Sequence, residues 1–333
     1  MNQINQNQKN NSLKNKLLLF FTQLILKMSK NKQKQSVQQQ TKFVNMKEFL
    51  SSPLSSHTDI QIIQMYNQMS DQEKQDLCSG LAKCTKLSKL ILHLNGSMLC
   101  DKDLQNLGQA LQKCSNLSTL SFSQDFNEIG PFGASIIGSA LLNLKNLSNL
   151  TLFLIGNQIQ DEGISSLASA LSNCTQFKKL ELCLNANQIN AQGASSLGQA
   201  LSKCINLTTL LIDICNNNIG DQGMSDLTTV FSNCTNLSNL SLNLNNNYIV
   251  NGCIPQLGSA LISYTSLISL TLDLRYNYIG VEAGLELSSA LAKCKNLLVL
   301  NLQLEQEYNY KEELLIKNKI LRMKRLVHYI VQV

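Results

Sequence analysis

One pattern of residues returns at every thirtieth position along most of this chain, from Leu87 to Leu297, without a change of register. Its clearest copy runs from Leu207 to Leu227 and reads LTTLLIDICNNNIGDQGMSDL. An internal repeat of this period is typical of a solenoid, in which each unit buries its apolar face only by stacking on its neighbours. The repeat therefore outweighs the length of 333 residues, which alone suggests about two ordinary domains.

Each repeat divides into a predicted strand and a predicted helix. In the first half, apolar residues occupy alternate positions, as in Leu150–Leu154, and this period of two predicts a strand with those side chains on one face. In the second half they recur at i, i+3 and i+7, as in Ile164–Leu171, which predicts an amphipathic helix. Pro131 and Pro255 fall near predicted helix starts, where a missing N–H costs least.

Strands that always return through a helix of the same hand must pair in parallel, with right-handed crossovers. Neighbouring strands lie about 4.8 Å apart, whereas packed helices need about 8–10 Å, so the stack must curve with its sheet inside. The sequence therefore predicts an α/β solenoid, a horseshoe-shaped arc with a parallel sheet on the concave face and helices on the convex face.

The repeat motif, L-x-x-L-x-L-x-L-x-x-N-x-I-G-D-x-G, resembles the ribonuclease-inhibitor-like class of leucine-rich repeats. Leu150–Gly163 and Leu210–Gly223 carry it best, and the resemblance covers about residues 75–310. In that family the Asn side chain caps backbone groups between neighbouring turns. The resemblance thus implies structural roles for Asn157, Asn187, Asn217, Asn247 and Asn277, from which Ser97 and Glu307 depart at the two ends. Each repeat of this chain is slightly longer than is usual in the class, by an extra pair of strand residues.

Six of the 11 cysteines occupy one position of the repeat. They are Cys84, Cys114, Cys174, Cys204, Cys234 and Cys294, and Leu144 and Tyr264 fill the same position in two other repeats. Exchange with Leu indicates a buried apolar site, where free Cys behaves as a small hydrophobe. Many unpaired thiols favour a reducing compartment, so we expect a cytoplasmic or nuclear protein.

The regions outside the repeats have other compositions. Residues 1–43 are rich in Asn, Gln and Lys, which predicts a disordered tail. Residues 44–86 are expected to form an N-terminal helical cap and a degenerate first repeat, with a helical stripe over His57–Met69 and a helix N-cap at Ser70-Asp71. Repeats follow over 87–309, and 310–333 are expected to form a basic capping helix.

The apolar run Leu17–Leu26 in the tail is too short to span a bilayer. It resembles the core of a signal peptide, but lysines follow it and no A-x-A-like cleavage site is present. Sequons at Asn149 and Asn239 lie within predicted strands, which also argues against export. Secretion is therefore the less favoured alternative, and Met28 is an alternative start of translation.

Charge is distributed unevenly along the chain. Residues 1–50 hold nine Lys and one acidic side chain, whereas residues 51–304 hold 13 basic and 17 acidic side chains. Attraction to membranes or other anionic surfaces is therefore expected at the termini and not in the repeats.

No recognised catalytic, nucleotide-binding or metal-binding motif occurs in the sequence. His57, His93 and His328 are far apart, no C-x-x-C pair is present, and no phosphate-binding glycine loop or G-x-S-x-G elbow is found. A regular array leaves little room for a preorganised catalytic pocket. We expect a non-enzymatic protein with no cofactor and no small-molecule substrate.

The predicted concave face exposes the residues between the leucines, which belong to no rule of the repeat. Phe153, Ile155, Cys183, Leu211 and Cys215 form an apolar cluster over three successive predicted strands. Charged residues border it, and apolar groups with an acidic rim suit a contact with protein more than with nucleic acid. The charged candidates are Glu181, Asp213, Asp273 and Arg275.

These observations favour a scaffold that binds a protein through its concave face. One alternative is a regulator of a small GTPase resembling the Ran activator, which shares this repeat class and uses an Arg near the repeat loops. Arg275 is the only Arg before the terminal helix, and the C-terminal region here is basic where that family usually has an acidic tail. Another alternative is an adaptor tethered to a membrane by its basic termini.

Overall fold

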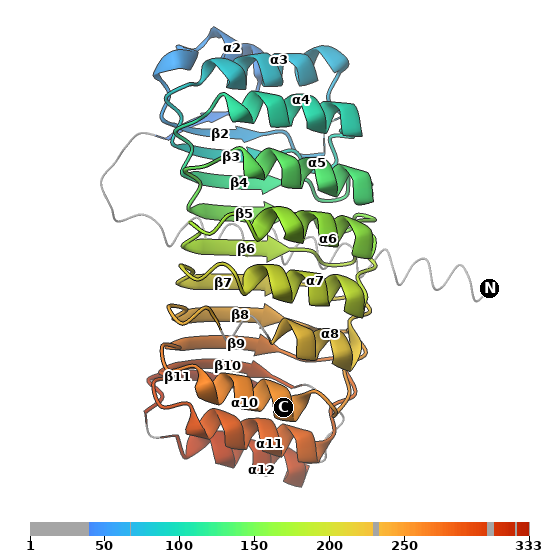
Figure 1. The fold of residues 1–333 in the computed structure, drawn as a ribbon, viewed down its shortest axis with the longest axis vertical. Coiled ribbons are helices and arrows are strands. Elements are labelled where there is room, and N and C mark those ends of the chain that lie inside the picture. The colour runs from blue at the N-terminus through green and yellow to red at the C-terminus, as the bar shows by residue number, and fades with distance from the viewer. Residues whose placement is uncertain (1–39, 67, 229–232, 305–309, 324, 333) are drawn as a thin grey trace, which may run out of the picture. The chain divides into compact units, whose positions relative to one another are not determined.

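The structure, a computed structural model, describes residues 40–66, 68–228, 233–304, 310–323 and 325–332. Within these residues, parallel strands form one sheet whose spatial order follows the chain from β1 to β11 (Figure 1). The strands are β1 (Thr41–Phe43), β2 (Asp59–Ile63), β3 (Lys89–His93), β4 (Thr119–Ser123), β5 (Asn149–Phe153), β6 (Lys179–Cys183), β7 (Thr209–Asp213), β8 (Asn239–Asn243), β9 (Ser269–Asp273), β10 (Val299–Gln303) and β11 (His328–Gln332).

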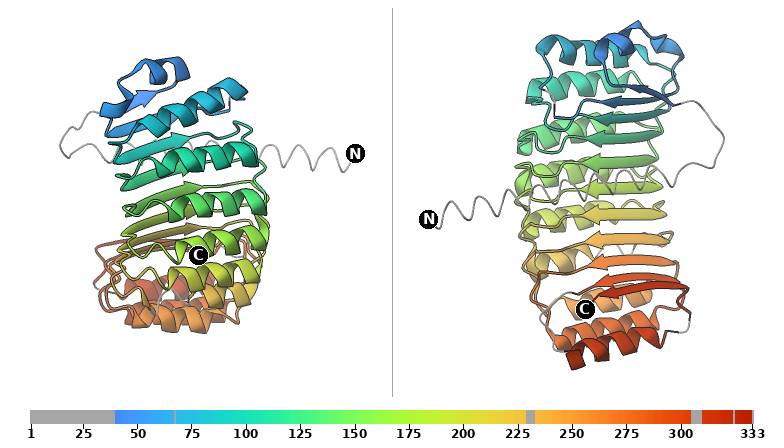
Figure 2. Two further views of the ribbon diagram at one scale, coloured as in Figure 1. Left: turned by 45° about the horizontal axis from the view of Figure 1, so that its top comes forward. Right: turned by 180° about the vertical axis from the view of Figure 1, so that it is seen from behind.

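Helices connect the strands, and the described helices lie on one face of the sheet (Figures 1 and 2). They are α2 (Met46–Ser51), α3 (Asp71–Lys83), α4 (Asp101–Gln112), α5 (Pro131–Leu142), α6 (Gln160–Leu171), α7 (Ala191–Leu201), α8 (Gly220–Leu227), α10 (Ile254–Ser263), α11 (Val281–Lys293) and α12 (Tyr310–Leu321), with a short 3₁₀ turn η1 (Leu54–Ser56) after α2. The predicted α/β repeat solenoid with one parallel sheet is confirmed.

The core lies between the sheet and the helices. In each strand from β3 to β10 the second and fourth residues are buried, as the period of two predicts. The opposite helix faces contribute the Leu and Ala residues predicted from the helical spacing. One continuous apolar cluster runs from Phe43 to Met323, so neighbouring units share a single core.

The Asn of each repeat links one turn of the solenoid to the next. The side-chain amide of Asn157 donates to the carbonyl of Gln124 at 3.0 Å, and its side-chain oxygen accepts from the N–H groups of Asn127 and Ile129 at 3.1 and 2.9 Å. Asn217 and Asn277 make the same three kinds of contact with the preceding turn. These bonds satisfy buried backbone groups in the loops, where neither helix nor sheet would pair them.

Ser97, which departs from the Asn pattern, keeps part of this role. Its hydroxyl donates to the carbonyl of Gln64 at 3.0 Å, the same offset along the chain that Asn157 spans to Gln124. The other departure, Glu307, lies outside the described residues.

The repeated cysteines are buried and unpaired, as predicted. Several thiols donate to carbonyls in the preceding turn, among them Cys114 to Leu81 at 3.4 Å and Cys234 to Leu201 at 3.3 Å. Tyr264 fills the same position, and its hydroxyl donates to the carbonyl of Cys234 at 2.7 Å. The site is therefore mainly apolar, with backbone carbonyls within reach of a thiol or hydroxyl donor.

Three expectations about the ends of the repeats are wrong. Thr41–Phe43, which the sequence assigned to a disordered tail, is strand β1. The stripe over His57–Met69 is not a helix, because Ile60 and Ile62 are the buried alternate residues of strand β2. Only Tyr310–Leu321 of the expected capping helix is helical, and His328–Gln332 forms strand β11 paired with β10.

Other expectations at the N-terminal side have different outcomes. The N-cap at Ser70 is confirmed, with a capping box between Ser70 and Glu73. Residues 1–39, including the apolar run Leu17–Leu26, lie outside the described residues. Among the helices that are described, none has the length and apolar character needed to cross a lipid bilayer.

Candidate functional site

The candidate site lies on the sheet face turned away from the helices, here called the open sheet face. It is formed by the first, third and fifth residues of each strand and by the residue two positions beyond each strand end. Phe153, Cys183 and Asp213 are the last residues of β5, β6 and β7 and lie side by side in register. Glu181 and Leu211 are likewise neighbours, at the third positions of β6 and β7.

The remaining predicted residues lie at or just beyond strand ends. Asp273 is the last residue of β9, while Ile155, Cys215 and Arg275 follow β5, β7 and β9. The structure thus brings together the predicted residues of β5 to β7. Asp273 and Arg275 lie apart from these, because β8 separates β7 from β9.

The exposure of these residues differs from the prediction. Phe153, Leu211 and Arg275 are partly exposed. The other six are buried: Ile155, Glu181, Cys183, Asp213, Cys215 and Asp273. The prediction treated every residue between the leucines as exposed, but strands only about 4.8 Å apart bring side chains of one row into contact, so larger neighbours cover smaller ones.

Phe153 and Leu211 are therefore the apolar side chains of the predicted cluster that remain accessible. They lie on strands either side of β6, where Cys183 pairs with the position of Phe153 and Glu181 with that of Leu211. Glu181 accepts from the Thr151 hydroxyl at 3.3 Å and forms an ion pair with Lys179 at 3.2 Å. Two apolar anchors with a neutralised carboxylate between them can contact protein without leaving a buried charge unpaired.

Asp125, which was not among the candidates, is the centre of a buried polar network at the end of β4. Its carboxylate accepts from the N–H of Ile155 at 2.7 Å and from the side-chain amide of Asn95 at 3.1 Å. The Ser123 hydroxyl donates to both Asn95 and Asp125. Burial raises the pKa of Asp125 to about 6, although these hydrogen bonds oppose the shift.

Asp213 and the two thiols near it share a second buried region. Burial raises the pKa of Asp213, and the N–H of Cys215, which donates to it at 3.3 Å, partly offsets this. Burial and the nearby carboxylates raise the pKa of both Cys183 and Cys215. Both thiols therefore stay protonated at neutral pH and are poor nucleophiles, so they act by packing.

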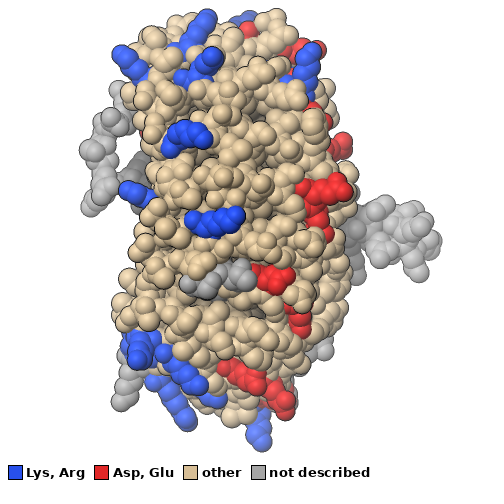
Figure 3. Space-filling view, viewed as in Figure 1, with Lys and Arg blue, Asp and Glu red and all other residues tan. Residues whose placement is uncertain are grey.

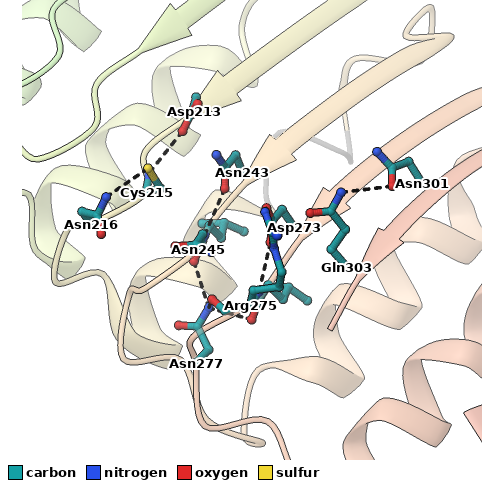
Figure 4. Close-up of polar contacts among 12 residues, drawn as sticks. Asp213, Cys215, Asn216, Asn243, Asn245, Asp273, Arg275, Asn277, Asn301 and Gln303 are labelled. Atoms are coloured by element: carbon teal, nitrogen blue, oxygen red, sulfur yellow. Dashed lines mark hydrogen bonds and ion pairs between the residues drawn. The ribbon is translucent and has the colours of Figure 1, made fainter. Parts of the chain in front are cut away.

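Asp273 and Arg275 form a local pair (Figure 4). The guanidinium donates to the carboxylate from Nε at 2.9 Å and from the terminal nitrogen at 2.6 Å, and the N–H of Arg275 donates at 3.1 Å. Figure 4 shows this pair beside Asn243 and Asn245 of the preceding repeat. The charge of Arg275 is thus held against its own strand end, where it is compensated locally.

The helix side of the molecule has two edges of opposite charge (Figure 3). Acidic residues lie in the first turns of helices, where they complement the helix dipole: Asp71, Glu73, Asp101, Asp103, Asp161, Glu162, Asp221 and Glu282. Exposed lysines lie at the other edge, near the helix ends and the turns before the strands: Lys83, Lys86, Lys113, Lys145, Lys178, Lys203, Lys293 and Lys295. The net charge of the repeats does not reveal this separation.

An exposed tyrosine cluster on the loops after β8 and β9 was also missed. It consists of Tyr248 and Tyr278, whose ring centroids lie 6.5 Å apart, and Tyr276 is also exposed on the loop that carries Tyr278. The sequence did contain a signal for these tyrosines. Tyr248 and Tyr278 directly follow the repeated Asn, at a position where the other repeats with this Asn carry polar residues. These rings add exposed aromatic surface on loops that follow strands of the same sheet.

No group of three or more His, Cys, Asp or Glu side chains that could hold a metal ion occurs in the part of the chain that the structure describes. The arrangement offers side chains suited to contact, with carboxylates held by hydrogen bonds and thiols kept protonated by burial. A scan against protein-family models finds no family that matches this chain, and a search of the curated proteins finds no relative.

Proposed function

We propose that this is a non-enzymatic leucine-rich-repeat protein, similar to the ribonuclease-inhibitor-like class, that binds another protein through its open sheet face and adjoining loops. The observation that carries the proposal is the difference in exposure between residues that the repeat requires and residues that it does not. Repeat residues such as Leu150 and Asn157 are buried and structural, while Phe153 and Leu211 obey no repeat rule and stay partly exposed. Exposed apolar side chains among hydrogen-bonded polar ones are typical of protein contact surfaces.

The free cysteines bear on where the protein acts. All 11 are unpaired, and nine of them are buried. Such a set of thiols suits a reducing compartment, which supports the proposal that the protein acts in the cytosol or nucleus.

The proposal is tested by affinity purification with the full chain as bait. The variant Phe153→Ser/Leu211→Ser removes the two accessible apolar groups of the open sheet face and leaves the core leucines in place. The matched control is Phe132→Ser, an exposed aromatic on α5 at the helix side. We expect at least one protein to be retained by the wild type and the control but lost, by tenfold or more, from the double variant.

A photo-crosslinking amino acid at position 211 gives an independent readout. We expect it to crosslink the same protein, and the same group at position 132 to leave that protein unlinked. Identical bound proteins for wild type and double variant, together with no crosslink at 211, would contradict the proposal.

A further inference from the structure

The last strand of the sheet differs from the strands before it. In β10, Leu300 and Leu302 face the helices and have no exposed surface. In β11, Tyr329 and Val331 lie in register with these two leucines, yet Tyr329 is 48% exposed and Val331 is partly exposed. The apolar core thus reaches the end of the described sheet without a polar layer over it.

The last described helix, α12, also leaves apolar side chains exposed at this end. Ile316 and Ile320 of α12 are buried against the preceding unit. β10 and β11 pair with one constant offset along the chain, as in Val299 with His328. With the same offset, Leu314 and Leu321 of α12 are equivalent to Leu285 and Ala292 of α11, which pack against the core. Leu314 and Leu321 are 42% and 51% exposed, so they occupy positions that an additional unit would cover.

These side chains form a surface of unusual composition. We define the C-terminal end surface by its exposed apolar residues: Leu314, Leu315, Leu321, Val327, Tyr329 and Ile330. They are six of the 18 large hydrophobic residues that are exposed in the described part of the chain, although they span only 17 positions. Such a concentration at one end indicates a contact surface and exceeds the scatter found on ordinary surfaces.

The backbone of β11 also has hydrogen-bonding groups directed outward. The N–H of His328 donates to Leu298 at 3.3 Å, and the carbonyl of Gln332 accepts from Leu304 at 2.7 Å, so these groups point toward β10. Because successive residues of a strand point to opposite sides, the N–H and C=O groups of Tyr329 and Val331 point to the outer edge. No strand lies beyond β11 among the described residues.

We propose that the C-terminal end surface binds a second copy of this chain about a two-fold axis, with the two β11 strands antiparallel and Ile330 opposite Ile330. In this register Tyr329 of each copy lies opposite Val331 of the other. The outward groups of these residues then form four hydrogen bonds, and the side chains form aromatic–β-branched pairs on the core side. The two-fold axis keeps the helix layers of both copies on the same side of one continuous sheet.

The helices support the same symmetry. Antiparallel packing of two α12 helices places Leu314 next to Leu321 of the other copy. Leu314 and Leu321 are seven residues apart and share one face of α12, and both are exposed. A patch that meets itself about a two-fold axis must be self-complementary, and these two leucines satisfy this requirement.

The main experiment measures the mass of the full chain by sedimentation and light scattering between 1 and 100 μM, roughly the range of ordinary homodimer affinities. We expect dimers for the wild type and monomers for Tyr329→Pro. That substitution removes the outward N–H and the ring of Tyr329 but none of the backbone groups that pair with β10, so this pairing and the circular dichroism spectrum should be retained. A monomeric wild type would overturn the proposal, as would a dimer that survives in Tyr329→Pro.

A substitution on α12 tests the interface without altering the strand. Leu321→Glu should weaken dimerisation about tenfold or more, because it places a charge among the apolar residues of the C-terminal end surface. Ile205→Glu, at an equally exposed apolar residue distant in the repeats, is the control and should have no effect. An equal effect of Ile205→Glu and Leu321→Glu, or a dimer that Leu321→Glu leaves unchanged, would contradict the proposed interface.

The register is tested by disulfide formation. Residues at position 330 form a non-hydrogen-bonded pair, with Cα atoms about 4.5 Å apart, which is within disulfide range. In a background with the exposed Cys100 replaced by Ser, Ile330→Cys should give a covalent dimer under mild oxidation, and His328→Cys should not. Crosslinking at 328 and not at 330 would overturn the antiparallel arrangement. None of these outcomes depends on what the open sheet face binds.

Discussion

The two ends of the repeat sheet differ in how they terminate. At the N-terminal end, Phe43, Met46 and Phe49 are buried, and the rings of Phe43 and Phe49 meet edge to face at 5.3 Å. The outermost strand that the structure describes at this end, β1, has only three residues and carries the exposed Lys42. A short, charged edge strand over a covered core resists further pairing.

At the C-terminal end, the five-residue strand β11 exposes Tyr329 and Ile330, and α12 exposes three leucines. Both ends consist of a strand and a helix, and they differ in strand length and in what covers the last layer. The comparison shows that covering an open end requires apolar residues that point back into the core, as Phe49 does. Adding one more strand and helix only moves the uncovered surface outward.

The N-terminal end, where Phe43, Met46 and Phe49 cover the core, is here called the closed end. The strongest test of the comparison removes one of these covering residues. Phe49→Ala should reduce the free energy of unfolding by about 3–5 kcal/mol, because the ring is fully buried against α3 and its loss leaves a cavity. Leu321→Ala, measured in the Tyr329→Pro background, should cost less than about 1 kcal/mol because that side chain is already half exposed. Chemical denaturation of both variants provides the comparison, and equal losses would contradict it.

A smaller effect is expected from two glutamines at equivalent core positions. Gln64 and Gln124 both occupy a position that is Leu or Ile in the other repeats and are both buried. The side-chain amide of Gln64 donates to the carbonyl of Val44 at 3.1 Å, which ties the N-terminal cap to β2. The side chain of Gln124 has no hydrogen-bond partner in the described structure.

The two substitutions by Leu should therefore have opposite signs. Gln124→Leu should stabilise the protein by about 1–2 kcal/mol, since it removes an unsatisfied buried amide. Gln64→Leu should destabilise it by about 1 kcal/mol, since it leaves the carbonyl of Val44 unpaired. Denaturation midpoints that shift in the same direction for both variants would show that the amide of Gln64 has no part in closing the end.

The smallest effect concerns pH at the closed end. His57 packs against Phe43 at 5.6 Å, and burial lowers the pKa of its imidazole. The folded end therefore binds fewer protons than the unfolded chain just below pH 6.5, so its stability falls as the pH falls through that value. Hydrogen exchange of residues 41–63, corrected for intrinsic rates, should be about two- to threefold faster at pH 5.5 than at pH 7.5.

His57→Gln serves as the control for this measurement and should remove the pH dependence. The same acceleration in His57→Gln, or an equal acceleration in residues 328–332, would assign the effect to other groups.

The sequence predicted the regular part of the fold because residues that repeat report directly on packing. The alternate leucines gave the strands, the i, i+3, i+7 spacing gave the helices, and the Asn and Cys positions are buried as expected. A second set of asparagines was overlooked. Asn116, Asn146 and Asn206 precede the strands and donate to carbonyls of the preceding turn, those of Thr85, Ser115 and Thr175.

The ends were harder to predict because the signal weakens where the repeat changes. Strand β2 was read as a helix because Ile60, Ile62 and Ile63 fit either period in so short a run. Strand β11 was missed because its register breaks the 30-residue repeat by one position, with Val299 paired to His328, and its core positions carry Tyr329 and Val331 in place of leucines. Apolar content alone cannot separate a covered end from an exposed one.

The candidate site was predicted in location but not in exposure. The strand period places Phe153, Glu181 and Leu211 on the open sheet face. Whether each side chain is accessible depends on neighbours such as Lys179 and Thr151 around Glu181, and on hydrogen bonds such as that from Ile155 to Asp125. A pattern within one repeat does not contain this information.

Hydrogen exchange of the full chain at two protein concentrations most directly tests the difference between the ends. If the C-terminal end binds a second copy, the amides of Tyr329 and Val331 should gain protection of tenfold or more at the concentration where dimers form, while β1 and β2 exchange at the same rate throughout. Exchange of β11 that does not depend on concentration, or equal gains at both ends, would contradict the account.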